Sequence, residues 1–247
     1  MMYVGIDIGS TASKVVIMDD ARRQILQKTV VPSGWNSKET AEQLLSWVKN
    51  FSDDFKIIAT GYGRVSVDFA DKTITEISCH GAGAYFLTGE DYTVIDIGGQ
   101  DTKVILLEDG KVLDFIMNDK CSAGTGKFLE VMANRLGLNL QEMFEFASKG
   151  NDLVLSSTCT VFAESEIISL MGKGTPREDI ARGVINQVVG KTVALVNRKA
   201  SSKDYFLSGG FCESEFIINE LKNKLKKNVY SHSLGRFAGA IGACMLG

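Results

Sequence analysis

The chain has 247 residues and a mean hydropathy of +0.04, and 45% of its residues are hydrophobic while 23% are charged. This composition is typical of a soluble globular protein with a large buried core, and the length allows one domain or two small ones. The formal net charge of -3 and the pI of about 5.5 offer no basic patch, which excludes nucleic acid as a partner. We therefore expect small molecules and proteins as partners.

The N-terminal sequence MMYVGIDIGS lacks the charged segment and the long apolar stretch of a secretory signal. No window reaches the ~18 apolar residues of a membrane span. We therefore expect a cytoplasmic protein with no membrane partner. The five cysteines are irregularly spaced without a CxxC pair, so a disulfide framework is not expected either.

Residues 4–18 (VGIDIGSTASKVVIM) and 94–107 (VIDIGGQDTKVILL) are two copies of one pattern. When Asp7 is aligned with Asp96, several further pairs are identical without a gap. They include Ile8/Ile97, Gly9/Gly98, Lys14/Lys103 and Val15/Val104. Each copy is a β-branched run ending in Asp, then a glycine turn, then a second apolar run, which predicts a β-hairpin. The segments DDARRQIL and EDGKVLDF that follow the two copies predict a further turn into a third strand.

A glycine turn with free backbone N–H groups, small hydroxyl residues and a neighbouring Asp suits a nucleotide phosphate with Mg²⁺. An ordinary hairpin is the alternative for a single copy, but two matched copies make that alternative poor. Neither copy fits GxxxxGK[ST] or GxGxxG, so neither a P-loop nor a Rossmann dinucleotide site is indicated.

Three other segments are predicted helices. In KETAEQLLSWVKNF (38–51), Leu44, Leu45 and Val48 share one face. In residues 175–198, we expect Thr175 as N-cap, Pro176 at the first helical position and Glu178 completing a capping box. The apolar segment LGRFAGAIGACMLG (234–247) predicts a helix packed tightly against a sheet.

A third glycine element, LSGGFCES (207–214), lies between the apolar run DYFL and the helical pattern ESEFIINELKNKL. Glycines at such a junction let a flat adenine or ribose approach the backbone. This signal alone is weak, because glycine is common between a strand and a helix.

The segments DIGSTASK, DIGGQDTK and SGGF resemble the phosphate-1, phosphate-2 and adenosine motifs of the actin, sugar kinase and Hsp70-like ATPase superfamily. More narrowly, four motifs resemble the activator ATPases of 2-hydroxyacyl-CoA dehydratases, a BadF/BadG/BcrA/BcrD-type family that includes benzoyl-CoA reductase subunits. These motifs are ATGYGR (59–64), EISCHGAGA (76–84), NDKCSAGTGKF (118–128) and SSTCTVFAESE (156–166). The resemblance covers nearly the whole chain.

The resemblance implies an α/β fold of the actin-like, ribonuclease H-like type, with two duplicated βββαβα-type domains and a nucleotide cleft. Domain I would comprise residues 1–88, with the phosphate-1 hairpin, and the helix 233–247 would pack back on it. Domain II would comprise residues 89–232, with the phosphate-2 hairpin, two cysteines and the adenosine motif.

Roles for single residues follow from their type and from the resemblance. Asp7 and Asp96 would orient Mg²⁺ or its waters. Gln100 would position the attacking water, with Asp101 as its rival, since a neutral amide can orient water without being a strong base. Three further groups would bind ATP or ADP: phosphate ligands of the first turn, phosphate ligands of the second turn, and glycines beside the adenosine. They are Gly9, Ser10, Thr11, Ala12 and Lys14; Gly98, Gly99 and Gln100; and Gly209 and Gly210.

Cys121 and Cys159 both lie just ahead of a helical pattern, the first of which covers residues 127–136. Free N–H groups and the dipole at a helix N-terminus stabilise anionic sulfur. Glycine, Ser, Thr and Lys surround both thiols, so a buried structural role fits them poorly. That role fits the other three cysteines better: Cys79, Cys212 and Cys244.

Two cysteines cannot complete a tetrahedral metal site or the shell of a [4Fe–4S] cluster, but a twofold homodimer supplies four thiolates. In the resembling family, the cysteines matching Cys121 and Cys159 hold one [4Fe–4S] cluster between two subunits. A zinc site at Cys79, His80 and His232 is a poorer alternative, because the spacing matches no finger and a structural histidine is commoner.

The resemblance therefore implies an ATPase that couples hydrolysis to one-electron transfer. A ferredoxin or flavodoxin would reduce the cluster, and a 2-hydroxyacyl-CoA dehydratase or a related iron–sulfur reductase would accept the electron. One alternative is a sugar-type kinase of the same fold, although the chain has no obvious segment for a sugar pocket. The other is a non-catalytic nucleotide switch, which would leave Cys121 and Cys159 unexplained.

Overall fold

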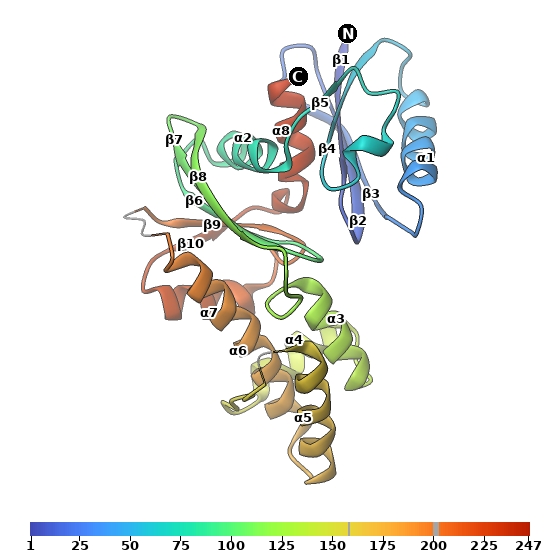
Figure 1. The fold of residues 1–247 in the computed structure, drawn as a ribbon. Helices are drawn as coiled ribbons and strands as arrows, with labels where there is room; N and C mark the ends of the chain where they lie inside the picture. The colour runs from blue at the N-terminus through green and yellow to red at the C-terminus, as the bar shows by residue number, and fades with distance from the viewer. Residues whose placement is uncertain (158, 200–202) are drawn as a thin grey trace. The chain divides into compact units, whose positions relative to one another are not determined.

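The computed structural model describes residues 1–157, 159–199 and 203–247 and contains two five-stranded sheets (Figure 1). The strand orders are β3-β2-β1-β4-β5 and β10-β9-β6-β7-β8. The chain divides into two compact units, residues 1–94, 105–115 and 232–247, and residues 95–104 and 116–231. The predicted domain limits, 1–88 with 233–247 and 89–232, stay a prediction, because the two units divide strands β6, β7 and β8 between them.

The first predicted hairpin is confirmed in the first sheet. Strands β1 (Met2–Ile8) and β2 (Ala12–Met18) pair antiparallel, and Asp7 lies opposite Lys14. Strand β3 (Ile25–Pro32) pairs antiparallel with β2, as the segment DDARRQIL predicts. Strand β4 (Phe55–Thr60) runs parallel to β1 and is followed by a short 3₁₀ turn (Arg64–Ser66) and by β5 (Lys72–Thr73).

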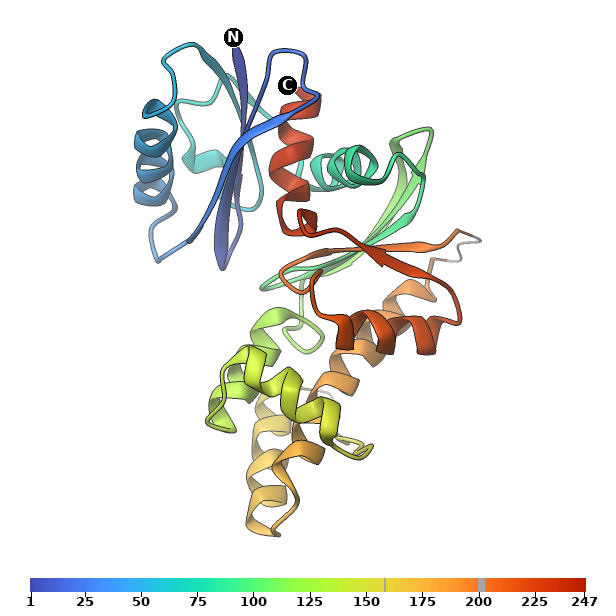
Figure 2. The same ribbon diagram turned by 180° about the vertical axis from the view of Figure 1, so that it is seen from behind.

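Side chains alternate between the two faces of this sheet, as the period of a β-strand requires. Val15 and Ile17 face helix α1 (Ser37–Lys49), whereas Val16 and Met18 face helix α8 (Ala238–Leu246). Figures 1 and 2 show α1 and α8 on opposite faces of the first sheet. Burial on both faces explains the nearly continuous apolar runs of β1 and β2.

Helix α2 (Glu76–Thr88) packs directly on α8, and glycines make this close approach possible. A Cβ atom on Gly83 would clash with the carbonyl of Ala238, and one on Gly242 would clash with the carbonyl of Cys79. The predicted C-terminal helix is therefore confirmed, with backbone-to-backbone packing that only small residues permit.

The second hairpin is formed by β6 (Thr93–Ile97) and β7 (Thr102–Glu108), and β8 (Lys111–Asn118) follows as the predicted third strand. Strands β9 (Tyr205–Gly209) and β10 (Val229–Ser231) run parallel to each other. The helices of the second unit are α3 (Gly126–Arg135), α4 (Leu140–Lys149), α5 (Thr160–Gly172), α6 (Arg177–Val196) and α7 (Glu215–Leu225).

The predicted start of the α6 helix is wrong by one residue. Pro176 is the N-cap with extended backbone (ψ 137), its carbonyl accepts from Asp179 and Ile180, and no side chain caps the helix. Thr175 instead donates its N–H to Leu170 at the end of α5, so the Thr175–Glu178 capping box does not form. In the described part of the chain, no helix combines the length and the apolar character needed to cross a membrane.

Replacing Gly242 by Ala is expected to lower the free energy of unfolding by about 1–3 kcal/mol, because the added methyl group forces α8 away from α2. Equilibrium unfolding in urea measures the change. Gly190→Ala is the control, since nothing lies within 4 Å of a Cβ at this helical position. The control should stabilise by about 0.5–1 kcal/mol; equal effects of the two substitutions would contradict the packing argument.

Candidate functional site

The turn of the first hairpin joins a buried carboxylate to an exposed loop. Asp7 is 1% exposed at the end of β1, and the Lys14 Nζ lies 3.5 Å from its Oδ2. Ser10 and Thr11 are exposed, while Gly9 and Ala12 are partly buried. Of the predicted phosphate ligands of this turn, Lys14 therefore contacts Asp7 directly, and the hydroxyl residues Ser10 and Thr11 are accessible.

Two glycines confine the carboxylate of Asp7. Gly61, in the motif ATGYGR, has φ +87, and a Cβ there would clash with Oδ1 of Asp7. A Cβ on Gly239, at the start of α8, would lie 2.8 Å from Oδ2 of Asp7 and 2.9 Å from Nε2 of His80. Any larger residue at either position would displace the carboxylate.

The turn of the second hairpin has a denser polar network. Asp96, 2% exposed, accepts a hydrogen bond from Ser208 Oγ at 2.8 Å. The buried ammonium group of Lys103 lies 3.4 Å from Asp96 and 2.7 Å from Asp101. Gly209, with φ +89, lies so close to the carbonyl of Ile97 that a Cβ would clash with it.

The two hairpins have equivalent surroundings that the sequence analysis did not detect. Thr60 and Gly61 lie at the end of β4, as Ser208 and Gly209 lie at the end of β9. Each glycine is close to the aspartate near the end of the neighbouring strand, β1 or β6. The equivalence escapes an ungapped alignment, because different lengths of chain separate each pair from its aspartate. One difference matters: Ser208 Oγ donates to Asp96, whereas no hydrogen bond joins Thr60 Oγ1 to Asp7.

The glycine turn of the second hairpin is bonded to helix α3. The N–H of Gly126 donates to the carbonyl of Gly98 at 2.9 Å, and the N–H of Lys127 donates to Gly99 at 2.8 Å. Thr102 Oγ1 also donates to the carbonyl of Gly124 at 2.8 Å. Gln100 is exposed in the same turn. The candidate phosphate turn and the segment that follows Cys121 therefore share main-chain hydrogen bonds.

The five cysteines separate into two groups. Cys79, Cys212 and Cys244 are buried, and burial raises the pKa of both Cys79 and Cys244 to about 12. Cys121 is exposed, and Cys159 is partly exposed as the N-cap of α5. The expectation of buried structural thiols is thus confirmed for the first group.

The segments that carry Cys121 and Cys159 lie side by side. Ser122 Oγ and Thr160 Oγ1 are 2.8 Å apart in a hydrogen bond, and Asn118 Nδ2 donates to the carbonyl of Cys121 at 2.9 Å. Thr158 of the motif SSTC lies outside the described residues. Thiolates are suitable ligands for iron and zinc, so the accessible pair fits a thiolate-bound metal or cluster.

No three His, Cys, Asp or Glu side chains form a metal-binding group within residues 1–157, 159–199 and 203–247. His80 is buried beside Glu76, with its Nε2 3.9 Å from the Glu76 carboxylate. His232 is exposed and accepts from the N–H of Leu234. The structural interpretation of these histidines therefore fits better than the zinc alternative.

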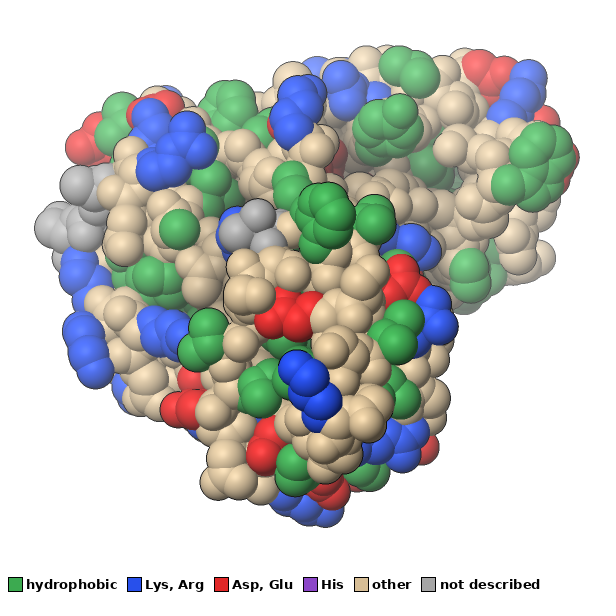
Figure 3. All heavy atoms as spheres, turned by 60° about the horizontal axis from the view of Figure 1, so that its bottom comes forward, with side chains coloured by type: hydrophobic (Ala, Val, Ile, Leu, Met, Phe, Trp, Pro, Cys, Tyr) green, Lys and Arg blue, Asp and Glu red, His purple; other side chains and the backbone are tan. Residues whose placement is uncertain are grey.

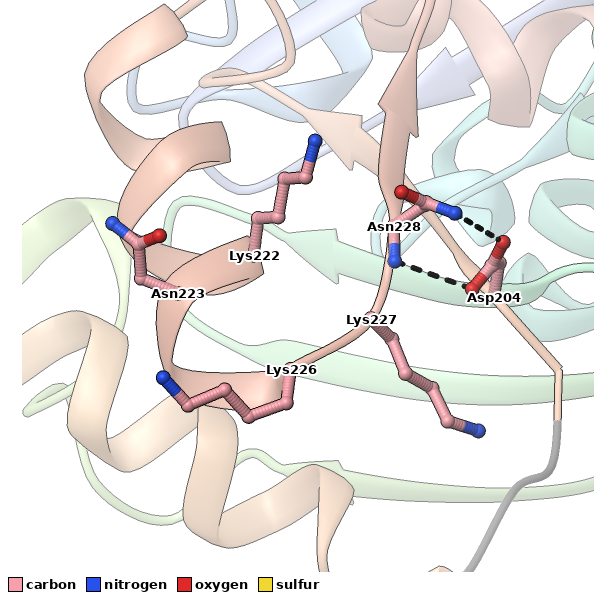
Figure 4. A pocket seen from close by; sticks show the side chains of 6 residues that line it. All are labelled: Asp204, Lys222, Asn223, Lys226, Lys227 and Asn228. Atoms are coloured by element: carbon pink, nitrogen blue, oxygen red, sulfur yellow. Dashed lines mark hydrogen bonds between the residues drawn. The ribbon is translucent and has the colours of Figure 1, made fainter.

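A shallow pocket between α7 and β10 is lined by lysine and asparagine side chains (Figure 4). Its lining residues are Asp204, Lys222, Asn223, Lys226, Lys227 and Asn228. The three lysine side chains extend in different directions, and Asp204 accepts two hydrogen bonds from Asn228. Cations at a helix C-terminus stabilise the helix dipole, which accounts for these lysines without a ligand.

Replacing Lys103 by Met is expected to lower the free energy of unfolding by about 3–5 kcal/mol, because it removes a buried ammonium group from the carboxylates of Asp96 and Asp101. Urea titration monitored by circular dichroism measures the loss. Lys111→Met, on the exposed start of β8, is the control and should change stability by less than about 0.5 kcal/mol. A small effect of Lys103→Met would show that the network does not stabilise the second hairpin.

Comparison with known proteins identifies both the fold and the family. The (R)-2-hydroxyglutaryl-CoA dehydratase activating ATPase of Acidaminococcus fermentans is 42% identical over 98% of this chain and 95% of that protein. The structure of the activator of the 2-hydroxyisocaproyl-CoA dehydratase from Clostridium difficile with bound ADPNP superimposes with a TM-score of 0.91. It is 36% identical, and the match covers 100% of this chain and 94% of that one.

A ROK family glucokinase from Streptomyces griseus has a TM-score of 0.64 at 14% identity, with coverage of 100% of this chain and 99% of that one. At this identity the likeness concerns the fold alone, and it confirms the predicted actin-like, sugar-kinase-like α/β architecture. Residues 4–247 match the sequence profile of one family. The resemblance inferred from the motifs is thereby confirmed, and the chain belongs to the BadF/BadG/BcrA/BcrD ATPase family.

Proposed function

We propose that this ATPase is the activator of a 2-hydroxyacyl-CoA dehydratase or a related iron–sulfur reductase, and that it couples ATP hydrolysis to the delivery of one electron. One observation carries the proposal: the glycine turn with Gly98 and Gly99 is hydrogen-bonded to the start of α3, directly after the segment with Cys121. The candidate nucleotide turn is thus hydrogen-bonded to the segment that follows an accessible thiol. Relatives named as dehydratase activators support the choice of partner.

Each hairpin would bind nucleotide phosphates through its turn. In the first turn, Ser10, Thr11 and Ala12 would donate to phosphate oxygens beside Lys14, while Asp7 would orient Mg²⁺ or its waters. In the second turn, Gly98 and Gly99 would supply N–H groups. Gly209 and Gly210 would flank the adenosine. The bound ADPNP of the Clostridium difficile relative supports nucleotide binding by this fold.

Gln100 is the better candidate for positioning the attacking water. Its side chain is exposed in the second turn, so it is accessible to solvent and nucleotide. Asp101 is paired with the buried Lys103 at 2.7 Å, so its carboxylate is already engaged by an ammonium group. Asp96 is likewise held by Lys103 and Ser208, which suits an orienting role.

Cys121 and Cys159 would together supply two of the four thiolates that a [4Fe–4S] cluster requires, and a homodimer would supply the other two. When reduced, the cluster would hold one electron at a low reduction potential for transfer to the partner enzyme. The surface of α5 beside Cys159 supports pairing with a second copy, because apolar residues there are exposed: Val161, Phe162, Ile168 and Met171. Figure 3 shows hydrophobic side chains at the surface on the side where α5 comes forward. Exposed apolar surface of this kind marks an interaction site.

A ferredoxin or flavodoxin would donate the electron, and the cytoplasm stays the expected location. The sugar-kinase alternative has less support, since its structural likeness concerns the fold alone and it assigns no role to Cys121 or Cys159. A non-catalytic nucleotide switch leaves the same two thiols unexplained.

Anaerobically reconstituted protein is expected to hold about four irons and four sulfides per dimer, with visible absorption of an iron–sulfur cluster. Cys121→Ser and Cys159→Ser should each lose this iron, because a shell of two thiolates does not retain a four-iron cluster. Cys212→Ser is the matched control and should keep it, because Cys212 is buried. Iron-free wild type that releases ADP only with a sugar would instead establish a kinase.

Gln100→Ala is expected to lower kcat for ATP hydrolysis about 100-fold while KM changes less than about twofold, because the water loses its orienting amide. Steady-state ADP release measures both constants. Gln141→Ala, at an exposed position of α4, should leave both unchanged. If Asp101→Asn causes the loss and Gln100→Ala does not, Asp101 positions the water.

A further inference from the structure

One carboxylate holds the chain just before Cys159. Glu166, on the second turn of α5, accepts from the N–H of Ser156 at 2.8 Å and from Ser156 Oγ at 2.9 Å, both at Oε1. Its other oxygen, Oε2, accepts from the N–H of Ser157 at 2.9 Å. Three donors therefore converge on one side chain, and two of them belong to the main chain.

The ionised form of Glu166 is the form that this arrangement favours. Burial raises its pKa, but the hydrogen bonds from Ser156 and Ser157 outweigh burial and lower the pKa to about 2. A carboxyl group with a lowered pKa stabilises the folded state above its ordinary pKa, and the contribution is lost only as the pH falls towards 2. At neutral pH Glu166 is therefore ionised and accepts all three hydrogen bonds.

Two further bonds fix the neighbours of Cys159. Gln187, on α6, donates its Nε2 to the carbonyl of Ser157 at 2.5 Å. On the other side of the cysteine, Thr160 is bonded to Ser122 of the Cys121 segment. The chain is thus held both before and after Cys159, by α5, by α6 and by the segment of the other thiol.

We infer that Glu166 is a positioning residue for Cys159: its carboxylate fixes residues 156 and 157 against α5, so the thiol is presented in one place before any ligand binds. The positioning role of Glu166 is independent of the proposed function; only the identity of the ligand that Cys159 binds rests on it. The other glutamate of α5, Glu164, does not share this role, because it forms an ion pair with Arg135 of α3.

The isosteric substitution Glu166→Gln tests the inference. Glutamine keeps the size of the side chain but replaces one acceptor oxygen by an NH₂ group, which then faces a backbone donor. Glu145→Gln is the matched control, because Glu145 is exposed on α4. Ser156→Ala is a milder variant, since it removes only the hydroxyl donor.

The first measurement uses the protein without iron. Hydrogen exchange of the Ser156 and Ser157 amides, and alkylation of Cys159 relative to Cys121 by iodoacetamide, report how firmly the segment is held. We expect both rates to rise about tenfold or more in Glu166→Gln, the factor that corresponds to one hydrogen bond to a charged group. Ser156→Ala should show a smaller rise and Glu145→Gln none. Equal rates in wild type and Glu166→Gln, with equal unfolding midpoints, would overturn the inference.

The second measurement follows iron loss from reconstituted protein in the presence of a chelator. Glu166→Gln should lose iron about tenfold faster than wild type and Glu145→Gln. Wild type that binds no iron would overturn the proposed function, while the exchange and alkylation rates would still decide the role of Glu166. Wild type and Glu166→Gln that retain iron equally well would overturn the positioning role alone.

Discussion

Two main-chain hydrogen bonds, from Gly126 to Gly98 and from Lys127 to Gly99, are the constraint on which the second unit depends. They use N–H groups that the first turn of a helix leaves without an intrahelical acceptor. The glycine turn thereby caps α3, and α3 cannot shift without pulling on the turn. A shift of α3 would therefore reach the turn through these two main-chain hydrogen bonds.

The two hairpins share one design but differ in how firmly their aspartates are held. Asp96 is bonded to Ser208 and paired with the fully buried Lys103, whereas Asp7 is paired at a similar distance with the partly exposed Lys14. A buried ion pair with additional hydrogen bonds is rigid, because breaking it exposes a desolvated charge. Under the proposed function, the partly exposed Lys14 would be accessible to a phosphate. The duplicated hairpin thus places nearly the same residues in two different environments.

Much of this fold follows from local signals in the chain. The hairpins, α1 and α8 were predictable because β-branched runs, glycine turns and apolar periodicity agree with their final surroundings. Helix α2 gave no such signal: Cys79, Gly81, Gly83 and Ala84 are buried on several sides, so no polar face marks its period. The start of α6 was misplaced because Thr175 is bonded to the end of α5, a tertiary contact that capping rules do not include.

The residues of the candidate site likewise fall into those that the sequence indicated and those that only the structure revealed. Residue types and spacing indicated the turn residues and the two accessible cysteines, because glycine, aspartate and polar neighbours are visible in any sequence. Lys103, Ser208 and Glu166 were not singled out, since each acts by contacting residues brought near by the fold. Lysine in a strand and glutamate in a helix are ordinary in isolation, and only burial or convergence of donors distinguishes them.

The packing of α8 also bears on when the first unit can form during synthesis. Cys244 Sγ contacts the carbonyl of Tyr3, and the two residues are 241 positions apart. Gly239 of the same helix completes the surroundings of Asp7. After β1, β2 and α1 have been synthesised, the face of the first sheet that α8 covers therefore stays exposed until α8 emerges from the ribosome. Contacts of such long sequence separation form late and slowly, so the nascent chain is vulnerable to aggregation during most of its translation.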